Sequence, residues 1–229
     1  MKIIRDEKYI KRRKTIGQYS GILAIFILGG GMYLSIQFQE QILYSFLSLV
    51  LGFTLSQISV FYTNRFGRSP RPDQQIDAAL KGLDDRYALY HYQTAVSHLL
   101  VGPAGIWVLL PFYQKGKIIY DQEKERWKRI GGNFYMKFFA QDSIGRPSQE
   151  IRDARKAVNK MLAKIPGLEA PQPRAALLFT SEKAQVEAEH APTPTLHINQ
   201  LKKMIRKEAK GERSLSMTAV RTVQDALEL

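Results

Sequence analysis

Two long runs of uncharged residues near the N-terminus constrain the fold of this chain most strongly. No Asp, Glu, Lys or Arg occurs from Thr15 to Gln39, and none occurs again from Gln41 to Asn64. A helix of about 20 apolar residues crosses the hydrocarbon core of a bilayer, so each run is long enough to do so. We therefore expect residues 16–62 to form two transmembrane helices, roughly Ile16–Ile36 and Ile42–Tyr62.

A cleaved signal peptide followed by a core helix is the competing interpretation of the same runs. It fits poorly, because no small-residue cleavage site follows the first run and the second run has the full length of a span. No charged residue lies within either run, which argues against a channel or a transporter.

The charges that flank the two runs predict their orientation. The basic residues are Lys2, Arg5, Lys8, Lys11, Arg12, Arg13 and Lys14 before the hairpin, and Arg65, Arg68 and Arg71 after it. The connecting loop carries only Glu40. Because positive charge is retained on the cytoplasmic side, we expect an integral protein of a bacterial inner (plasma) membrane with both termini in the cytoplasm. The chain is therefore expected to consist of a basic cytoplasmic N-terminus at 1–15, the two transmembrane helices at 16–62, a linker at 63–72 and a cytoplasmic domain at 73–229.

Small residues recur along both runs. They are Gly17, Gly21, Gly29, Gly30 and Gly31 in the first run, and Ser45, Ser48, Gly52, Ser56 and Ser59 in the second. Small residues let helices approach closely, so they suit packing within the hairpin or a homodimer of hairpins. The other interpretation is that they are incidental and face lipid.

The pattern after residue 72 is that of a soluble α/β domain. Helices are expected at Asp73–Leu83, Pro147–Ile165, Asn199–Lys207 and Leu215–Leu229, and strands at Arg86–His91, Val96–Val101, Ile106–Leu110, Ala175–Thr180 and Thr193–Ile198. About 150 residues are enough for one hydrophobic core. The chain has no cysteine, which excludes disulfides and thiolate metal sites. Its net charge of +13 favours nucleic acid or anionic lipid as a partner.

The stretch Thr94–Ile118 contains two apolar runs around the turn Gly102-Pro103-Ala104-Gly105, which predicts a β-hairpin. With His98, the motif Ile106-Trp107-Val108 and the motif Gly116-Lys117-Ile118, this stretch resembles the core of the nuclease-related domain (NERD) family. That family is a branch of the PD-(D/E)xK restriction-endonuclease-like superfamily. The resemblance implies a restriction-endonuclease-like fold, a mixed sheet flanked by helices, over about residues 72–229.

The resemblance also implies that the catalytic residues are missing. The family's metal-binding aspartate falls on Ser97, its glutamate on Leu110 and its lysine on Phe112. Leucine and phenylalanine cannot hold Mg²⁺ or offset charge on a phosphate, so we expect no catalysis and no cofactor. Asp73 and Gln149 are candidate relics of the family's site. Each also has an ordinary explanation, as a helix N-cap and a first-turn polar residue.

The densest basic cluster of the soluble domain follows this hairpin. It consists of Lys115, Lys117, Lys124, Arg126, Lys128 and Arg129. It suits contact with nucleic acid or lipid, or it is a solvated strand edge whose charges prevent aggregation. The aromatic residues Phe134, Tyr135, Phe138 and Phe139 that follow suit packing better than base stacking.

Together these features predict a membrane-anchored, inactive nuclease-related protein that acts as a binding or scaffold module at the cytoplasmic membrane face. Its partners would be the lipid bilayer and a protein, a nucleic acid or a second copy. The alternative is a Mg²⁺-dependent nuclease for DNA or RNA that rebuilt its site from Asp73, Asp84, Asp85 or Asp121. A further alternative is an accessory subunit of a larger membrane complex.

Overall fold

The computed structural model describes residues 1–130, 144–166, 168 and 171–228. Residues 131–143, with the aromatic cluster expected at 134–139, lie outside this description. The chain divides into two compact units, one of Asp6–Arg71 and one that joins Met1–Arg5 to Pro72–Leu229. We call them the helical unit and the soluble unit.

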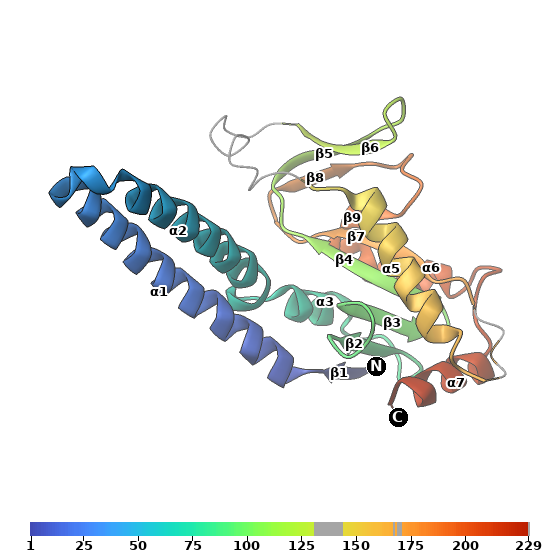
Figure 1. The fold of residues 1–229 in the computed structure, drawn as a ribbon. Coiled ribbons are helices and arrows are strands. Elements are labelled where there is room, and N and C mark those ends of the chain that lie inside the picture. Colours follow the sequence, from blue (N-terminus) through green and yellow to red (C-terminus); the bar gives the residue numbers. More distant parts are fainter. Residues whose placement is uncertain (131–143, 167, 169–170, 229) are drawn as a thin grey trace. The chain divides into compact units, whose positions relative to one another are not determined.

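The helical unit is an antiparallel pair of long helices (Figure 1). α1 spans Glu7–Gln37 and α2 spans Ile42–Tyr62, with a 3-10 turn, η1 (Gln39–Gln41), between them and a π-helical turn, η2 (Thr63–Gly67), after them. The two predicted helices are confirmed, and α2 has the expected bounds. α1 begins before the apolar run because Asp6 caps it: its Oδ1 accepts a hydrogen bond from the backbone N–H of Tyr9 at 2.8 Å.

Small residues hold the two helices close together. A Cβ added to Gly21 would lie 2.6 Å from Ser59 Oγ, and one added to Gly31 would lie 1.9 Å from Ser48 Oγ. Ser59 Oγ also donates a hydrogen bond to the Gly17 carbonyl at 2.7 Å. These residues therefore serve packing within the hairpin. Gly29 and Gly30 take no part in it, since nothing lies within 4 Å of a Cβ placed there.

The outer surface of the helical unit is apolar. Phe26 is 73% exposed and Ile42 is 75% exposed. Both helices are long and apolar enough to cross a membrane.

The soluble unit is built on a six-stranded mixed sheet in the order β1-β2-β3-β4-β7-β9. Its strands are β1 (Lys2–Arg5), β2 (Ala88–His91), β3 (His98–Gly102), β4 (Gly105–Phe112), β7 (Arg174–Phe179) and β9 (Thr195–His197). β2, β3 and β4 are antiparallel neighbours, whereas β1, β7 and β9 each pair in parallel. The predicted α/β fold with a mixed sheet and helices is confirmed.

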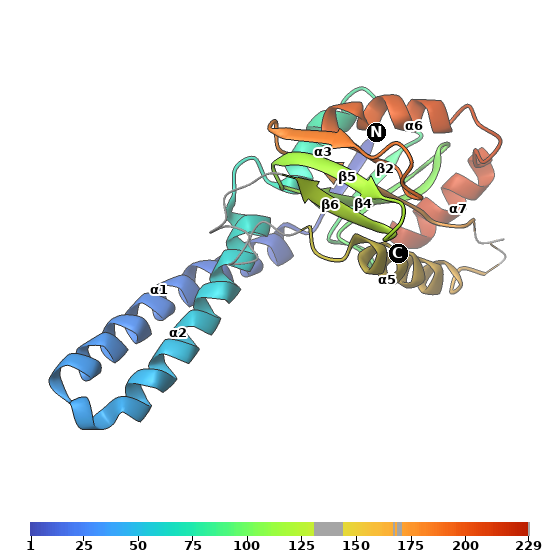
Figure 2. The same ribbon diagram turned by 90° about the horizontal axis from the view of Figure 1, so that it is seen from above.

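In the part of the chain that the structure describes, the soluble unit also has a smaller sheet, in the order β6-β5-β8, and four helices (Figures 1 and 2). The strands are β5 (Gly116–Asp121), β6 (Arg126–Ile130) and β8 (Ala184–Glu187). The helices are α3 (Pro72–Leu80), α5 (Pro147–Leu162), α6 (Leu201–Glu208) and α7 (Met217–Glu228), with a 3-10 turn, η3 (Ile198–Gln200), before α6.

The large sheet carries a hydrophobic core on each face. On one face, Val108 of β4 and Leu177 of β7 pack with residues of α5, α7 and the smaller sheet. On the other face, Leu109 and Leu178 pack with residues of α3 and α6. We call the first the α5 face and the second the α3 face. Neighbouring residues of one strand point to opposite faces, so each strand residue belongs to one or the other.

The first five residues form an element that the sequence did not predict. β1 pairs in parallel with β2, with Lys2 opposite Ala88 and Arg5 opposite His91. The segment expected as one basic N-terminus, 1–15, is therefore divided between a strand of the soluble unit and the first turns of α1.

Candidate functional site

The part of β4 that matches the family's catalytic positions is apolar. Leu110 is half-buried on the α5 face, and Phe112 is buried there with its ring stacked on that of Phe179, their centroids 5.6 Å apart. Ser97 directly precedes β3. It lies in a bend, outside the β3–β4 pairing, which runs from Leu99 opposite Val108 to Gly102 opposite Gly105. The three positions thus offer a hydroxyl and two hydrocarbon side chains, where a magnesium site would need several hard oxygen ligands.

Pro111 occupies the end of β4, beyond the residues that pair with β3. Residues 105–108 of β4 pair with β3, whereas Pro111 lies opposite Leu178 of β7. Because proline lacks an N–H, it fits a strand position beyond the β3 pairing.

The opposite face of the sheet carries a buried polar cluster, which we call the Arg5 network: Arg5, Asp73, Asp77, His91 and His98. Strand register sets Arg5 beside His91 and His91 beside His98, across β1, β2 and β3. α3 lies over these strands and supplies the two carboxylates. Asp73 and His91 are fully buried, and His98 is 2% exposed.

The contacts of the Arg5 network form a continuous chain. Arg5 Nε lies 2.9 Å from Asp73 Oδ2, and its Nη2 contacts Asp77 Oδ2. Asp77 Oδ1 lies 2.9 Å from His91 Nε2, and His91 Nδ1 lies 2.8 Å from His98 Nδ1. A carboxylate can only accept, so His91 donates through Nε2 and, when neutral, accepts at Nδ1 from His98. Burial and charge pairing make this a unit that binds β1 to α3.

The structure does not place the two candidate relics, Asp73 and Gln149, beside Leu110 and Phe112. Asp73 belongs to the Arg5 network on the α3 face, and so lies across the sheet from Phe112. Its carboxylate pairs with Arg5, which is a structural role beyond that of a helix cap. Gln149 is exposed in the first turn of α5, where its N–H donates to the Arg146 carbonyl at 3.0 Å.

The basic cluster of the β5–β6 hairpin is divided between two faces. Register pairs Ile118 with Arg129 and Tyr120 with Trp127, and Ile118 and Trp127 are buried, so Arg129 lies on the inner face. The alternate residues, including Lys117 and Lys128, lie on the outer face. Lys117 pairs with Glu187 at 2.6 Å, and Lys128 pairs with Asp121. Acidic partners thus offset part of the positive charge that the sequence places in this cluster.

The acids proposed for a rebuilt nuclease site have separate surroundings. Asp84 pairs with Arg86, and the Lys128 ammonium, with help from the Lys124 N–H, holds the pKa of Asp121 below its ordinary value. Asp85 is exposed in the loop after α3. Within the described part of the chain, no three His, Asp or Glu side chains are placed to share a metal ion.

The Arg5 network could not be found from local sequence patterns. Arg5 is separated from Asp73 by the whole helical unit, and Asp77 sits in an ordinary amphipathic helix. The one available signal is that His91 and His98 lie in two consecutive expected strands.

Comparison of this chain with models of protein families, with curated proteins and with solved structures finds no match in any of the three. The nuclease-related assignment therefore rests on the residues of the β3–β4 hairpin and remains a proposal.

Proposed function

We propose that this chain is a membrane-anchored, nuclease-related protein that acts as a binding or scaffold module at the cytoplasmic membrane face and does not cleave nucleic acid. The observation that carries the proposal is the packing of Leu110 and Phe112 in the core of the α5 face. Hydrolysis of a phosphodiester by this superfamily needs metal-bound oxygen ligands and a nearby cation at those positions. Phe112 instead stacks on Phe179, so this part of the sheet does not supply those groups.

The connections between the two units support a membrane hairpin. β1 lies before α1 and β2 lies after α2, yet the two strands pair in one sheet. Strands of one sheet must lie on the same side of a bilayer, so the helices between them would cross it an even number of times. The charges that flank the two helices independently predict the same even number of crossings. It also disfavours a cleaved signal peptide, because cleavage after α1 would remove a strand of the sheet.

Short connections would also keep the soluble unit near the membrane. Only Asp6 separates β1 from α1, and residues 68–71 separate η2 from α3. Two such connections restrict a domain more than a single flexible linker does, which suits a scaffold that presents a surface near lipid.

A nuclease assay tests the proposal against its alternative. The detergent-purified full chain is incubated with Mg²⁺ or Mn²⁺ and with plasmid DNA or single-stranded RNA. We expect no cleavage above the level of the same incubation with EDTA in place of the metal. Metal-dependent cleavage would reject the binding-module proposal in favour of a rearranged nuclease.

A further inference from the structure

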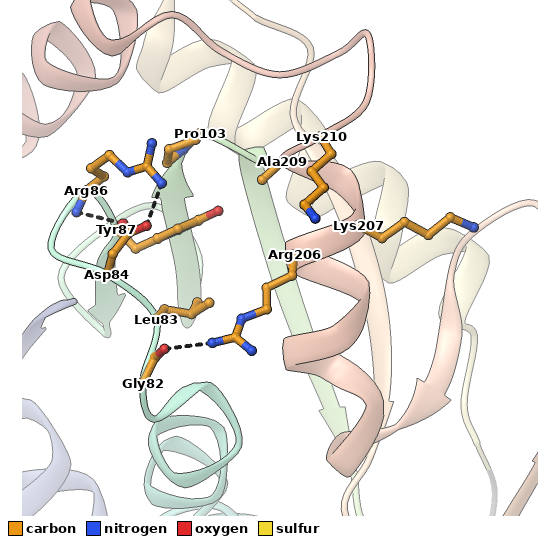
Figure 3. Close-up of a pocket in the computed structure, with 10 residues that line it drawn as sticks. All are labelled: Gly82, Leu83, Asp84, Arg86, Tyr87, Pro103, Arg206, Lys207, Ala209 and Lys210. Carbon is orange, nitrogen blue, oxygen red and sulfur yellow. Dashed lines mark hydrogen bonds and ion pairs between the residues drawn. The ribbon is translucent and has the colours of Figure 1, made fainter.

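A pocket of about 670 Å³ lies between the α3–β2 loop and the C-terminal end of α6 (Figure 3). This volume is within the range of small-molecule sites. Its lining residues are Gly82, Leu83, Asp84, Arg86, Tyr87, Pro103, Arg206, Lys207, Ala209 and Lys210. Four of these side chains are cationic and one is anionic, so the pocket favours a negatively charged ligand. All of them belong to the soluble unit.

Arg86 is held in place on one side of this pocket. Its Nη2 lies 2.6 Å from Asp84 Oδ2, and its backbone N–H donates to Asp84 Oδ1 at 3.1 Å. The guanidinium carries five N–H donors, so it retains donors for a ligand. The hydrogen bond from Arg86 also keeps the pKa of Asp84 below its ordinary value, so this pair persists at neutral pH.

Arg206 is positioned from the opposite side by the turn that ends α3. Gly82 has a φ of +82°, which glycine adopts without strain, and its carbonyl accepts a hydrogen bond from Arg206 Nη2 at 3.1 Å. Figure 3 shows the Lys210 ammonium pointing toward the space between α6 and Tyr87, whereas Lys207 extends away from it. Arg86, Arg206 and Lys210 thus line one pocket from segments about 120 residues apart in sequence, and Figure 3 shows Arg86 on the other side of Tyr87 from Arg206.

The wall between these cations is apolar and well packed. Leu83 is 8% exposed and Tyr87 is 3% exposed. The Tyr87 ring lies against Gly102, where an added Cβ would come within 2.2 Å of it. A pocket with an apolar wall and a few convergent polar groups is the usual form of a small-molecule site.

We propose that this pocket binds a phosphate monoester, with Arg206 contacting the phosphate oxygens and Lys210 adding charge. Arginine matches phosphate geometry through paired N–H donors, and phosphate carries a larger charge than a carboxylate. The volume exceeds that of inorganic phosphate and leaves room for the group that carries it. This site goes beyond the proposed function and does not depend on it, because it needs neither a membrane-spanning hairpin nor the absence of cleavage.

Two sources share this chemistry: a soluble nucleoside or sugar phosphate, and the headgroup of a phospholipid such as phosphatidic acid. The full chain in phosphatidylcholine nanodiscs is therefore titrated with AMP, with adenosine and with inorganic phosphate. A second set of nanodiscs contains phosphatidic acid. We expect AMP to bind and adenosine not to bind. Loss of AMP binding in the second set would assign the site to the lipid headgroup, and unchanged binding would assign it to a soluble phosphate.

Variants that make the same change in net charge test whether the phosphate binds in this pocket. Arg206→Gln and Lys210→Gln should each weaken phosphate binding, roughly tenfold or more for the arginine. Lys203→Gln, an exposed position of α6 outside the pocket, makes the same change in net charge and should leave binding unaltered. Among the described residues, the Lys210 ammonium makes no hydrogen bond or ion pair, so its variant keeps the test valid if Arg206→Gln unfolds. The proposal is overturned if neither AMP nor phosphatidic acid binds, if adenosine binds as well as AMP, or if Lys203→Gln has the same effect as Lys210→Gln.

Discussion

At the scale of single residues, the Arg5 network has the largest predicted effect on stability. The Arg5 guanidinium lies between two carboxylates, one of which, that of Asp73, is fully buried. Removing one partner of a buried ion pair costs about 3 kcal/mol or more, because the remaining charge stays in a poorly solvated place. We therefore expect Arg5→Ala to destabilise the soluble unit by about that amount.

The chain provides a convenient probe and a matched control for this prediction. Its two tryptophans, Trp107 and Trp127, are both buried in the soluble unit, so intrinsic fluorescence follows the unfolding of that unit in the detergent-solubilised full chain. Lys2 lies on the same strand and pairs with Glu228 at 2.6 Å, but 57% of its side chain is exposed. Lys2→Ala should cost about 0.5 kcal/mol or less. Equal effects of the two variants would refute a special role for the Arg5 network.

Tyr90 gives a prediction about pH. Burial, with smaller contributions from Glu228 and Asp225, raises the pKa of Tyr90 above its ordinary value of 10.0. A group whose pKa is raised by folding contributes stability that is complete below its unfolded pKa and is lost as the pH rises above it. Tyr90→Phe should therefore lose stability less steeply than the wild type above pH 10.

The measurement is the free energy of unfolding of both proteins from pH 7 to pH 11. Below pH 9 the two curves should run parallel, separated by about 1 kcal/mol or less, because the Tyr90 hydroxyl makes only a long contact of 3.5 Å with the Gln224 carbonyl. Identical slopes above pH 10 would show that burial of this hydroxyl does not control its ionisation.

At the scale of elements, most of the secondary structure could be predicted because its signals are local. Residues 42–62 became α2 with the expected ends. The expected C-terminal helix is α7, and Ser216 Oγ caps it by accepting a hydrogen bond from the Ala219 N–H. β1 and β8 are four residues long and mix charged or polar residues with apolar ones, so no apolar run marked them. A strand of that length is fixed by its neighbour in the sheet, which local periodicity does not reveal.

The helical unit gives a prediction about packing between elements. The Cβ position of Gly21 lies 3.4 Å from Ser59 Cβ, close to the separation of roughly 3.5–4.5 Å in a disulfide. The wild-type chain has no cysteine, so a pair introduced here reacts without background. The variant with Gly21→Cys and Ser59→Cys should form an intramolecular disulfide on mild oxidation, detected by mass spectrometry of the linked peptides.

The control pair is Gly30→Cys with Ser59→Cys. Gly30 lies on the same helix but has nothing within 4 Å of its Cβ position, so we expect no internal disulfide. Covalent dimers in place of the internal crosslink in the first variant would indicate that the small residues join two copies and not two helices of one chain.

At the scale of the whole molecule, the site was harder to predict than the fold. The match of the β3–β4 stretch to the family motif indicated that Leu110 and Phe112 replace polar residues. The structure places both in a hydrophobic core. The same match could not indicate that Asp73 lies on the other face of the sheet. That outcome depends on Arg5, which reaches Asp73 only because the segments before and after the helical unit fold together. Such long-range pairing leaves no local pattern in a single sequence.

We propose that the helical unit crosses a membrane and holds the soluble unit on its cytoplasmic side. Cysteine accessibility tests it most directly, since the natural chain has no thiol. Single variants Glu40→Cys, between the two helices, and Glu189→Cys, exposed in the soluble unit, are treated with a membrane-impermeant maleimide. We expect Glu40→Cys to be labelled in intact cells and Glu189→Cys only after lysis. Labelling of Glu189→Cys in intact cells, or protection of Glu40→Cys until lysis, would contradict this account.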